Sequence, residues 1–390
     1  MKLLQNLKLA LAILAAAGLA ACGGGGGGTA SADSGTLRLA LTDAPSCGYD
    51  AVNITVVKVR VHQSSSAGDN DSGWSEIVLN PSRRLNLLNL TNGVLDELGQ
   101  TPLPTGKYTQ LRLVLADNGG ATPMANSVVP TGGAEVALKT PSGQQSGVKA
   151  NINIDVATNK TADFVIDFDA CKSVVVAGNS GQYLLKPVVS VIPRYVSGVA
   201  GFVDLATLAN GNTSLSLQQA GVVIKASVPD NTGRFMLQPV APGAYTLVMT
   251  APGRTTMVVT NVAVSAETVT SINASGTALV SPASLSGTVT GTAPTDTLVR
   301  ARQTLTVGTT VEVAGRFVDS VTGVYNYPLV VNAPLVAPYV PAPGLLVFTA
   351  DAPVAGKYTL KASLTGFTDK NSLLATLTPG GTITTNFSFP

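Results

Sequence analysis

The stretch TLRLALT at residues 36–42 places leucine at every second position. This period of two is that of a β-strand with one buried face. The turn-forming residues Asp-Ala-Pro at 43–45 end the run. Comparable apolar runs follow at residues 111–115, 152–156 and 164–168, without helical periodicity between them. The sequence therefore predicts an all-β chain whose first unit, residues 35–195, is an antiparallel β-sandwich head.

The next strand predicted in this unit changes the face that its apolar residues occupy. Ile54 and Val56 share one parity, whereas Val57, Val59 and Val61 share the other. A shift of one residue in a regular strand would turn its apolar side chains from the core toward solvent. An extra residue in the strand compensates for such a shift. We therefore expect a β-bulge near Val56 and Val57.

Two segments depart from the strand pattern. Residues 94–98, closed by Gly99, have the form of a single helical turn that ends at a glycine. Residues 325–343 contain five prolines, and proline cannot donate a hydrogen bond to a sheet. We expect a short helical turn at the first segment and a long insertion or loop at the second.

The composition excludes several classes of function. Charged residues make up 12% of the 390 residues, and the formal net charge is +2, so nothing attracts the chain to nucleic acid. His62 is the single histidine, which excludes polyhistidine metal sites and mechanisms that need two imidazoles. We expect His62 to be a surface residue. No cofactor or metal site is predicted.

The N-terminal residues resemble a lipoprotein signal. Residues 1–21 combine a basic start with an apolar run too short to span a bilayer, and Leu19-Ala20-Ala21-Cys22 matches the bacterial lipobox. The resemblance implies lipidation of Cys22, and several acyl chains anchor a protein stably to a membrane. Residues 22–34, which contain six consecutive glycines, form the flexible tether expected behind such an anchor. We expect a lipid-anchored protein of the cell envelope. Gly23 stands where similar lipoproteins carry an Asp for retention at the inner membrane, so the outer membrane is favoured. An ordinary signal peptide is the alternative.

Four motifs in the first unit resemble a known family. They are LTDAP at residues 41–45, VKVRV at 57–61, GKYTQLRL at 106–113 and DFDAC at 167–171. Together they are similar to the bacterial domain-of-unknown-function family 4382, whose members are mostly exported lipoproteins. The family has no established activity, so the resemblance supports a domain boundary and implies no chemistry.

The remainder of the chain is predicted to form two smaller sandwiches. Residues 196–281 resemble the carboxypeptidase regulatory-like modules, which are related to transthyretin and to collagen-adhesin B repeats and usually act as spacers or binding units. Residues 282–390 repeat part of this pattern, because GKYTL at 356–360 followed by Gly366 matches GAYTL at 243–247 followed by Gly253. The third unit is therefore predicted to be a second, divergent β-sandwich.

Five residues carry predictions about covalent cross-links in these units. With Cys22 lipidated, Cys47 and Cys171 remain; a disulfide is expected in an oxidising compartment, and two unpaired buried thiols are the alternative. Resemblance to collagen-adhesin repeats also raises a Lys–Asn isopeptide bond. Its candidate residues are Lys225, Glu267 and Asn273, for which ordinary surface positions are favoured.

Carboxylates of the first unit gather on one predicted strand face. Asp163, Asp167 and Asp169 share parity, and Asp155 ends the preceding strand. Such oxygens could collect Ca²⁺, although the spacing of a calcium loop is missing. A solvated face, with Asp169 capping a turn, is the favoured interpretation.

These features favour a non-enzymatic binding or scaffold module with a glycan or envelope-protein ligand and no nucleic-acid partner. The natural contact residues would be exposed aromatic side chains, for which the candidates are Trp74, Tyr325, Tyr327 and Tyr339. The first alternative is an accessory subunit that positions an exported enzyme or complex. A second alternative is a hydrolase that uses the paired carboxylates Asp167 and Asp169.

Overall fold

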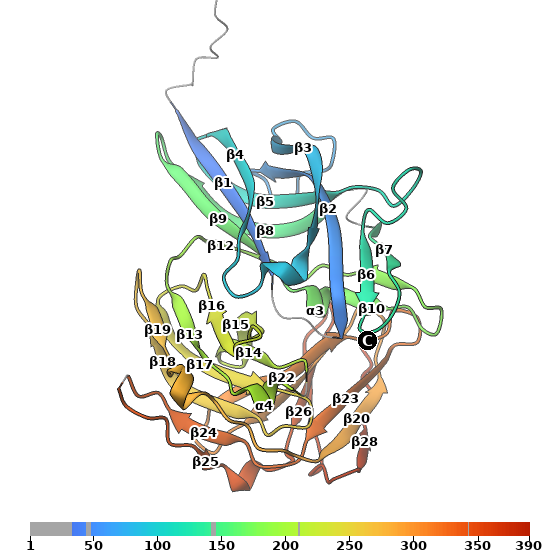
Figure 1. The fold of residues 1–390 in the computed structure, drawn as a ribbon. Coiled ribbons are helices and arrows are strands. Elements are labelled where there is room, and N and C mark those ends of the chain that lie inside the picture. Colours follow the sequence, from blue (N-terminus) through green and yellow to red (C-terminus); the bar gives the residue numbers. More distant parts are fainter. Residues whose placement is uncertain (1–32, 44–47, 142–145, 210, 342) are drawn as a thin grey trace, which may run out of the picture.

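A computed structural model describes residues 33–43, 48–141, 146–209, 211–341 and 343–390. The described chain is almost entirely β, with only single helical turns between strands, so the predicted all-β class is confirmed. Figure 1 shows the first unit lying above the other two, which pack side by side beneath it. Within the described ranges, no helix has the length and apolar character needed to cross a membrane.

The first unit is a sandwich of two sheets. One sheet has the order β12-β9-β1-β4, and the other has the order β10-β11-β7-β6-β2-β5-β8 with β3 also paired to β2. Leucines at 37, 39 and 41 are fully buried between the sheets, as the alternation predicted. The strands of the first sheet are β12 (Val189–Pro193), β9 (Thr161–Phe168), β1 (Ser34–Asp43) and β4 (Asp96–Pro104). Those of the second are β10 (Val174–Val176), β11 (Tyr183–Leu185), β7 (Val136–Lys139), β6 (Ser127–Pro130), β2 (Tyr49–His62), β5 (Gly106–Leu115), β8 (Val148–Val156) and β3 (Ser75–Asn86).

The predicted bulge is present in β2. The register of β2 shifts between Val56 and Lys58 against two of its three neighbours, β3 and β5. Val56, Val59 and Val61 consequently all face the core. The sandwich is not purely antiparallel, because β1 pairs in parallel with β9.

The helical turn expected at residues 94–98 is wrong. Asp96 and the residues after it belong to β4, which pairs with β1, and Leu98 is the extra residue of a register shift opposite Leu39 and Ala40. Gly99, with a φ of 129°, allows this irregular pairing. The helical turn lies earlier, at η1 (Leu87–Leu90), where the side chain of Asn86 accepts a hydrogen bond from the Leu88 backbone.

The second unit packs a small sheet on a larger one. The small sheet is ordered β16-β13-β19, and the larger one β15-β14-β17-β18-β24-β25. Their bounds are β16 (Arg234–Leu237), β13 (Gly198–Phe202), β19 (Val269–Ser271), β15 (Val222–Ser227), β14 (Ser214–Gln219), β17 (Gly243–Thr250), β18 (Met257–Val264), β24 (Leu335–Pro338) and β25 (Thr349–Ala350). The last two strands come from the sequence of the third unit, so the two units share a sheet.

The third unit packs the sheet β23-β20-β28 on the sheet β22-β21-β26-β27. Its strands are β23 (Val324–Val330), β20 (Ser286–Thr292), β28 (Thr382–Thr384), β22 (Thr310–Phe317), β21 (Leu298–Thr304), β26 (Thr359–Ser363) and β27 (Lys370–Leu373). The remaining helical turns of the described chain are α3 (Ala170–Ser173), α4 (Leu205–Leu208), η2 (Ser275–Thr277) and η3 (Ala352–Val354).

The long loop expected at residues 325–343 is therefore wrong. Most of it forms β23 and β24, and β24 pairs in parallel with β18 of the second unit. Pro328 is accommodated because β23 is an edge strand, paired only with β20 within the described sheet.

Candidate functional site

The first and second units are joined by a buried ion pair. Lys225 of β15 donates to Asp167 of β9 at 2.7 Å, and the two side chains are only 2% and 9% exposed. The solvated face expected for Asp167 is wrong because the second unit covers this end of β9. Asn92, after η1, adds a neutral contact, exchanging hydrogen bonds with Ser227 and accepting from the backbone of Met236.

Asp43, at the end of β1, lies close to this ion pair. The residue is fully buried, and its Oδ1 atom accepts a hydrogen bond from the Ala170 backbone at 2.9 Å. Burial raises the pKa of Asp43 well above its ordinary value, the Ala170 hydrogen bond opposes this, and the charges of Asp169 and Asp167 raise it further. The junction thus contains a carboxyl group that resists ionisation.

Lys172 links the first unit to the third. Asp169 caps α3 by accepting from the Lys172 backbone, which confirms its predicted capping role. The Lys172 Nζ atom lies 3.3 Å from carboxylates of both Asp169 and Glu312, and Arg300 approaches Glu312 at 3.4 Å. Burial alone would lower the pKa of Lys172, but these two carboxylates raise it above the ordinary value. Lys172 is therefore a cation held between acids from two units.

The second and third units meet through Gln218 of β14 and Glu312 of β22. The Gln218 amide donates to the Glu312 carbonyl at 2.8 Å and accepts from the Glu312 backbone at 2.7 Å. An apolar cluster of Val248, Val258, Leu305 and Val311 lies at the same interface. Together with the shared sheet, these contacts join the two units.

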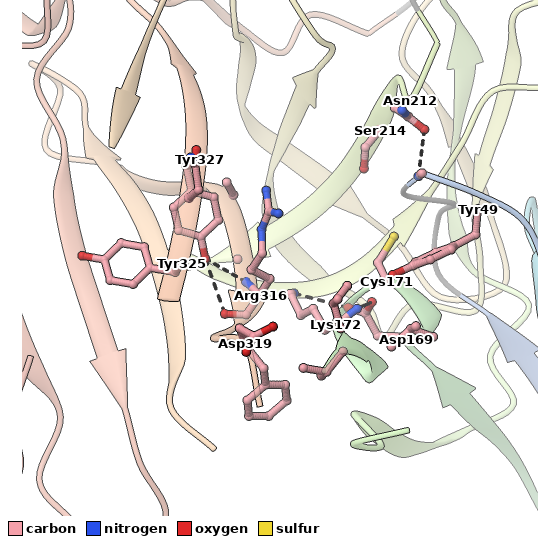
Figure 2. Close-up of a pocket in the computed structure, with 18 of the residues that line it drawn as sticks. Tyr49, Asp169, Cys171, Lys172, Asn212, Ser214, Arg316, Asp319, Tyr325 and Tyr327 are labelled. Atoms are coloured by element: carbon pink, nitrogen blue, oxygen red, sulfur yellow. Dashed lines mark hydrogen bonds and ion pairs between the residues drawn. The ribbon is translucent and has the colours of Figure 1, made fainter. Parts of the chain in front are cut away.

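A cavity of about 940 Å³ lies where the three units meet. Figure 2 shows its polar side chains, contributed by all three units. The first unit supplies Tyr49, Asp169, Cys171 and Lys172; the second supplies Asn212, Ser214 and Ser216; the third supplies Glu312, Arg316, Asp319, Tyr325 and Tyr327. Valines from all three units line the rest of the wall. A concave, largely apolar site with a few converging polar groups is typical of a ligand pocket.

The exposure predicted for two aromatic residues is wrong. Tyr325 and Tyr327 are 2% and 1% exposed, because β23 packs its tyrosines into the third unit's core. Their hydroxyl groups donate to backbone carbonyls of Thr385 and Val299. Burial raises the pKa of Tyr325 to about 12 and that of Tyr327 further. Both nevertheless line the cavity, so a role in ligand binding stays a prediction.

The other two predicted contact residues lie away from this cavity. Trp74 is half-buried between the guanidinium groups of Arg60 and Arg112, which lie 4.5 and 4.6 Å from its ring. Tyr339 packs against the core of the second unit and donates to the Ser271 carbonyl at 3.2 Å. Both rings have structural partners, and their role in binding stays a prediction.

The structure does not bring the three isopeptide candidates together. Lys225 pairs with Asp167, whereas the Asn273 side chain bonds both backbone groups of Phe202 and Glu267 is exposed. The surface position favoured for Lys225 is therefore wrong, and its partner is Asp167, not Asn273. His62 is half-buried, with Nδ1 accepting from the Ser64 backbone at 2.8 Å.

Asp163 likewise has its own partners, since it pairs with Arg38 and Arg194. Among the described residues, no group of three His, Cys, Asp or Glu side chains could hold a metal ion. The predicted lipidation residue Cys22 and Cys47, the predicted disulfide partner of Cys171, lie outside the described residues. The pairing of Cys171 with Cys47 accordingly stays a prediction.

Sequence reasoning missed Lys172, Gln218, Glu312 and Arg316. Each lies on a strand or turn whose polar residues look solvent-facing when one unit is considered alone. The only signal available was DFDAC followed by Lys172, an Asp three residues before a lysine at the start of a helical turn.

Residues 34–187 match the family described as "Domain of unknown function (DUF4382)". The match agrees with the resemblance predicted for the first unit, and it covers less than half of the chain. No curated protein matches the sequence.

Solved structures give only distant likenesses. A type II cohesin–X-dockerin complex from Acetivibrio cellulolyticus is 23% identical, with 22% of this chain and 58% of that chain covered and a TM-score of 0.19. The pilus adhesin SpaC from Lactobacillus rhamnosus GG is 10% identical over 91% of this chain and 44% of that chain, with a TM-score of 0.15. The major pilin SpaA from Corynebacterium diphtheriae is 9% identical over 91% of this chain and 100% of that chain, with a TM-score of 0.18. The chain spans less than two thirds of the cohesin–dockerin chain, and TM-scores this low support no functional argument.

Proposed function

We propose that this protein is a lipid-anchored, non-enzymatic binding or scaffold protein of the cell envelope whose ligand site is the cavity between its three units. One observation carries the proposal. Buried ion pairs and a shared sheet join three β units around a cavity of about 940 Å³ lined by residues of each unit. Because burying ion pairs is costly unless they are well partnered, this junction favours a fixed arrangement over freely hinged spacers.

The partners of Asp167 and Asp169 support a binding role over hydrolysis. Asp167 and Asp169 are engaged by different lysines, Lys225 and Lys172. A glycosidase needs two carboxyl groups facing one cleft, one to protonate the leaving group and the other to act as nucleophile or base. The carboxylate-dependent hydrolase therefore loses its proposed pair.

The anchor belongs to the proposal because it determines where the cavity works. The lipobox ending at Cys22 and the glycine-rich tether precede β1, which begins at Ser34. A flexible tether of this composition would let the folded body stand off a lipid surface. An outer-membrane lipoprotein, facing either the periplasm or the outside, fits this order of segments.

Metabolic labelling with palmitate tests the anchor directly. The wild-type chain and a Cys171→Ala variant are expected to incorporate label and to fractionate with membranes, whereas Cys22→Ala is expected to do neither. Protease shaving of intact cells then decides on which side of the membrane the units lie. Label retained in Cys22→Ala would contradict lipid anchoring at this residue.

The ligand is sought by applying the purified chain to an array of envelope glycans and by cross-linking in intact cells. Saturable glycan binding, or a reproducible cross-link from a cavity residue to one envelope protein, would support the binding role. A cross-link to an exported enzyme would favour the accessory-subunit alternative. Hydrolysis of an arrayed glycan would contradict the non-enzymatic assignment.

A further inference from the structure

One of the two cations that line the cavity lacks an ion-pair partner in the part of the chain that the structure describes. Lys172 is paired with Asp169 and Glu312. The Asp319 carboxylate accepts backbone N–H groups, including that of Gly178 at 2.7 Å, and these bonds together lower its pKa although burial opposes them. Among the described residues, Arg316 has no ion-pair partner. Arg316 is therefore the cation of the wall that is free to pair with a carboxylate of a ligand, although the wall also contains the carboxylates of Asp169, Glu312 and Asp319.

The position of Arg316 is fixed while its donors remain available. Its guanidinium carbon lies 4.8 Å from the centre of the Tyr327 ring, and its backbone N–H donates to the Tyr327 hydroxyl at 3.0 Å. Stacking on an aromatic ring holds the guanidinium plane without using its N–H groups. Such a planar fork matches the two oxygens of a carboxylate. Figure 2 shows this side chain between the tyrosines of β23 and the wall that carries Tyr49.

Tyr49 supplies an aromatic surface on the wall formed by the first unit. Its ring packs edge-on against Tyr183 with 6.1 Å between centres. Burial raises the pKa of Tyr49 to about 12, and Tyr183 raises it further. The charge of Arg316 lowers the pKa of Tyr49, so Tyr49 and Arg316 are close enough to interact electrostatically. An aromatic ring beside a cation suits a ligand with both an apolar face and an acid group.

Two hydrogen-bonding groups of the second unit complete the cavity wall. The Asn212 side-chain oxygen accepts from the Gly48 backbone at 3.3 Å. Within the described ranges, neither the Asn212 amide nitrogen nor the Ser214 hydroxyl has a hydrogen-bond partner. These groups can bond the hydroxyl groups of a ligand.

We propose that the cavity binds a sugar ring that carries a carboxylate, with Arg316 on the carboxylate, Tyr49 against the ring and Asn212 and Ser214 on its hydroxyl groups. The inference rests on the proposed function and specifies its ligand class. A cavity of about 940 Å³ has room for one or a few such rings. Two envelope sources share this chemistry: acidic polysaccharides built from uronic acids, and the muramic acid of peptidoglycan.

Titration calorimetry with glucuronate and with glucose tests the carboxylate requirement, using the full mature chain in a detergent without a sugar headgroup. We expect saturable binding of glucuronate and none of glucose. Arg316→Gln should weaken glucuronate binding by about tenfold or more, the scale of a lost charge-assisted hydrogen bond, and Arg316→Lys should lie between. Arg234→Gln, an exposed arginine outside the cavity, is the matched control and should bind normally.

The outcomes separate this inference from the envelope proposal. Equal binding of glucose, binding that survives Arg316→Gln, or no binding of either sugar would each overturn the carboxylate site, whatever the palmitate labelling shows. A thermal melt of Arg316→Gln that matches the wild type excludes unfolding as the cause of lost binding. Comparing a uronic acid oligosaccharide with N-acetylmuramic acid then identifies which source the cavity prefers.

Discussion

At the scale of single residues, Asp43 makes the stability of the first unit depend on pH. Its native pKa is raised, first by burial, so the folded protein holds a proton that the unfolded chain releases above a pKa of about 3.9. Stability from this group is therefore complete below that value and is lost as pH rises toward the native pKa. Each unit by which the pKa of Asp43 in the folded protein exceeds its pKa in the unfolded chain corresponds to a loss of about 1.4 kcal/mol of unfolding free energy.

Asp43→Asn is predicted to remove this dependence. Asparagine keeps the oxygen that accepts from Ala170 and carries no charge. Between about pH 4 and about pH 8, the wild type should lose free energy of unfolding relative to the variant, as measured by urea denaturation. For Asp117→Asn, at an exposed position, the free energy of unfolding should differ from that of the wild type by the same amount at every pH. If the difference between Asp43→Asn and the wild type were also independent of pH, the prediction would be contradicted.

The disulfide between Cys47 and Cys171 is a second prediction at this scale. Asp43 bonds to Ala170, and Gly48 and Tyr49 line the same cavity as Cys171, so the residues on both sides of 44–47 lie near α3. A cross-link enclosing about 120 residues would stabilise the fold by at most about 4–5 kcal/mol. Alkylation followed by intact mass analysis should find both thiols blocked until reductant is added. Two reactive thiols in the untreated protein would exclude the bond.

At the scale of elements, residue parity predicted β1, β5 and β9, whose partners lie in the same unit, but it missed β4 and β23. The parity change at Val56 and Val57 correctly indicated a bulge because the core face is set by local alternation. Residues 335–338 were missed as a strand because β24 pairs with β18, in which each partner lies 78 residues earlier, as in Met257 with Leu335. Local patterns contain no information about a pairing between units.

Deleting Val57 tests the bulge. Without the extra residue, Val56, Val59 and Val61 fall into regular alternation, so all three keep facing the core. We therefore expect the deletion to cost less than about 3 kcal/mol of unfolding free energy. Deleting Arg38 from the regular run of β1 would instead put Leu37 and Leu39 on opposite faces, and it should cost more than about 4 kcal/mol, seen as a lower melting temperature and faster proteolysis of the first unit. Equal losses would show that Val57 is not the extra residue of β2.

At the scale of the whole molecule, the sequence missed the site between the units. Glu312 lies between two valines of β22, and Gln218 follows Leu217 in β14; each alternation indicates a polar residue on a solvated face. The structure buries both residues because a second unit covers that face. The alternation of polar and apolar residues along a strand distinguishes its two faces. Only the packing of the units against each other shows which polar face is covered by another unit.

The last prediction concerns the connection of the first unit to the third. Lys172→Ala would leave Asp169 and Glu312 facing each other without the cation between them. Removing one member of a buried ion pair costs about 3 kcal/mol or more, because the remaining charge stays desolvated. In scanning calorimetry, unfolding of the first unit should separate from that of the other two. Lys186→Ala removes a second link between the same units, but its partner Asp296 is 68% exposed, so its cost should stay below about 1 kcal/mol with the profile unchanged. If the two variants unfold alike, the ion pairs of Lys172 with Asp169 and Glu312 do not couple the first unit to the third. The shared sheet and the apolar contacts alone would then have to maintain the cavity between the units.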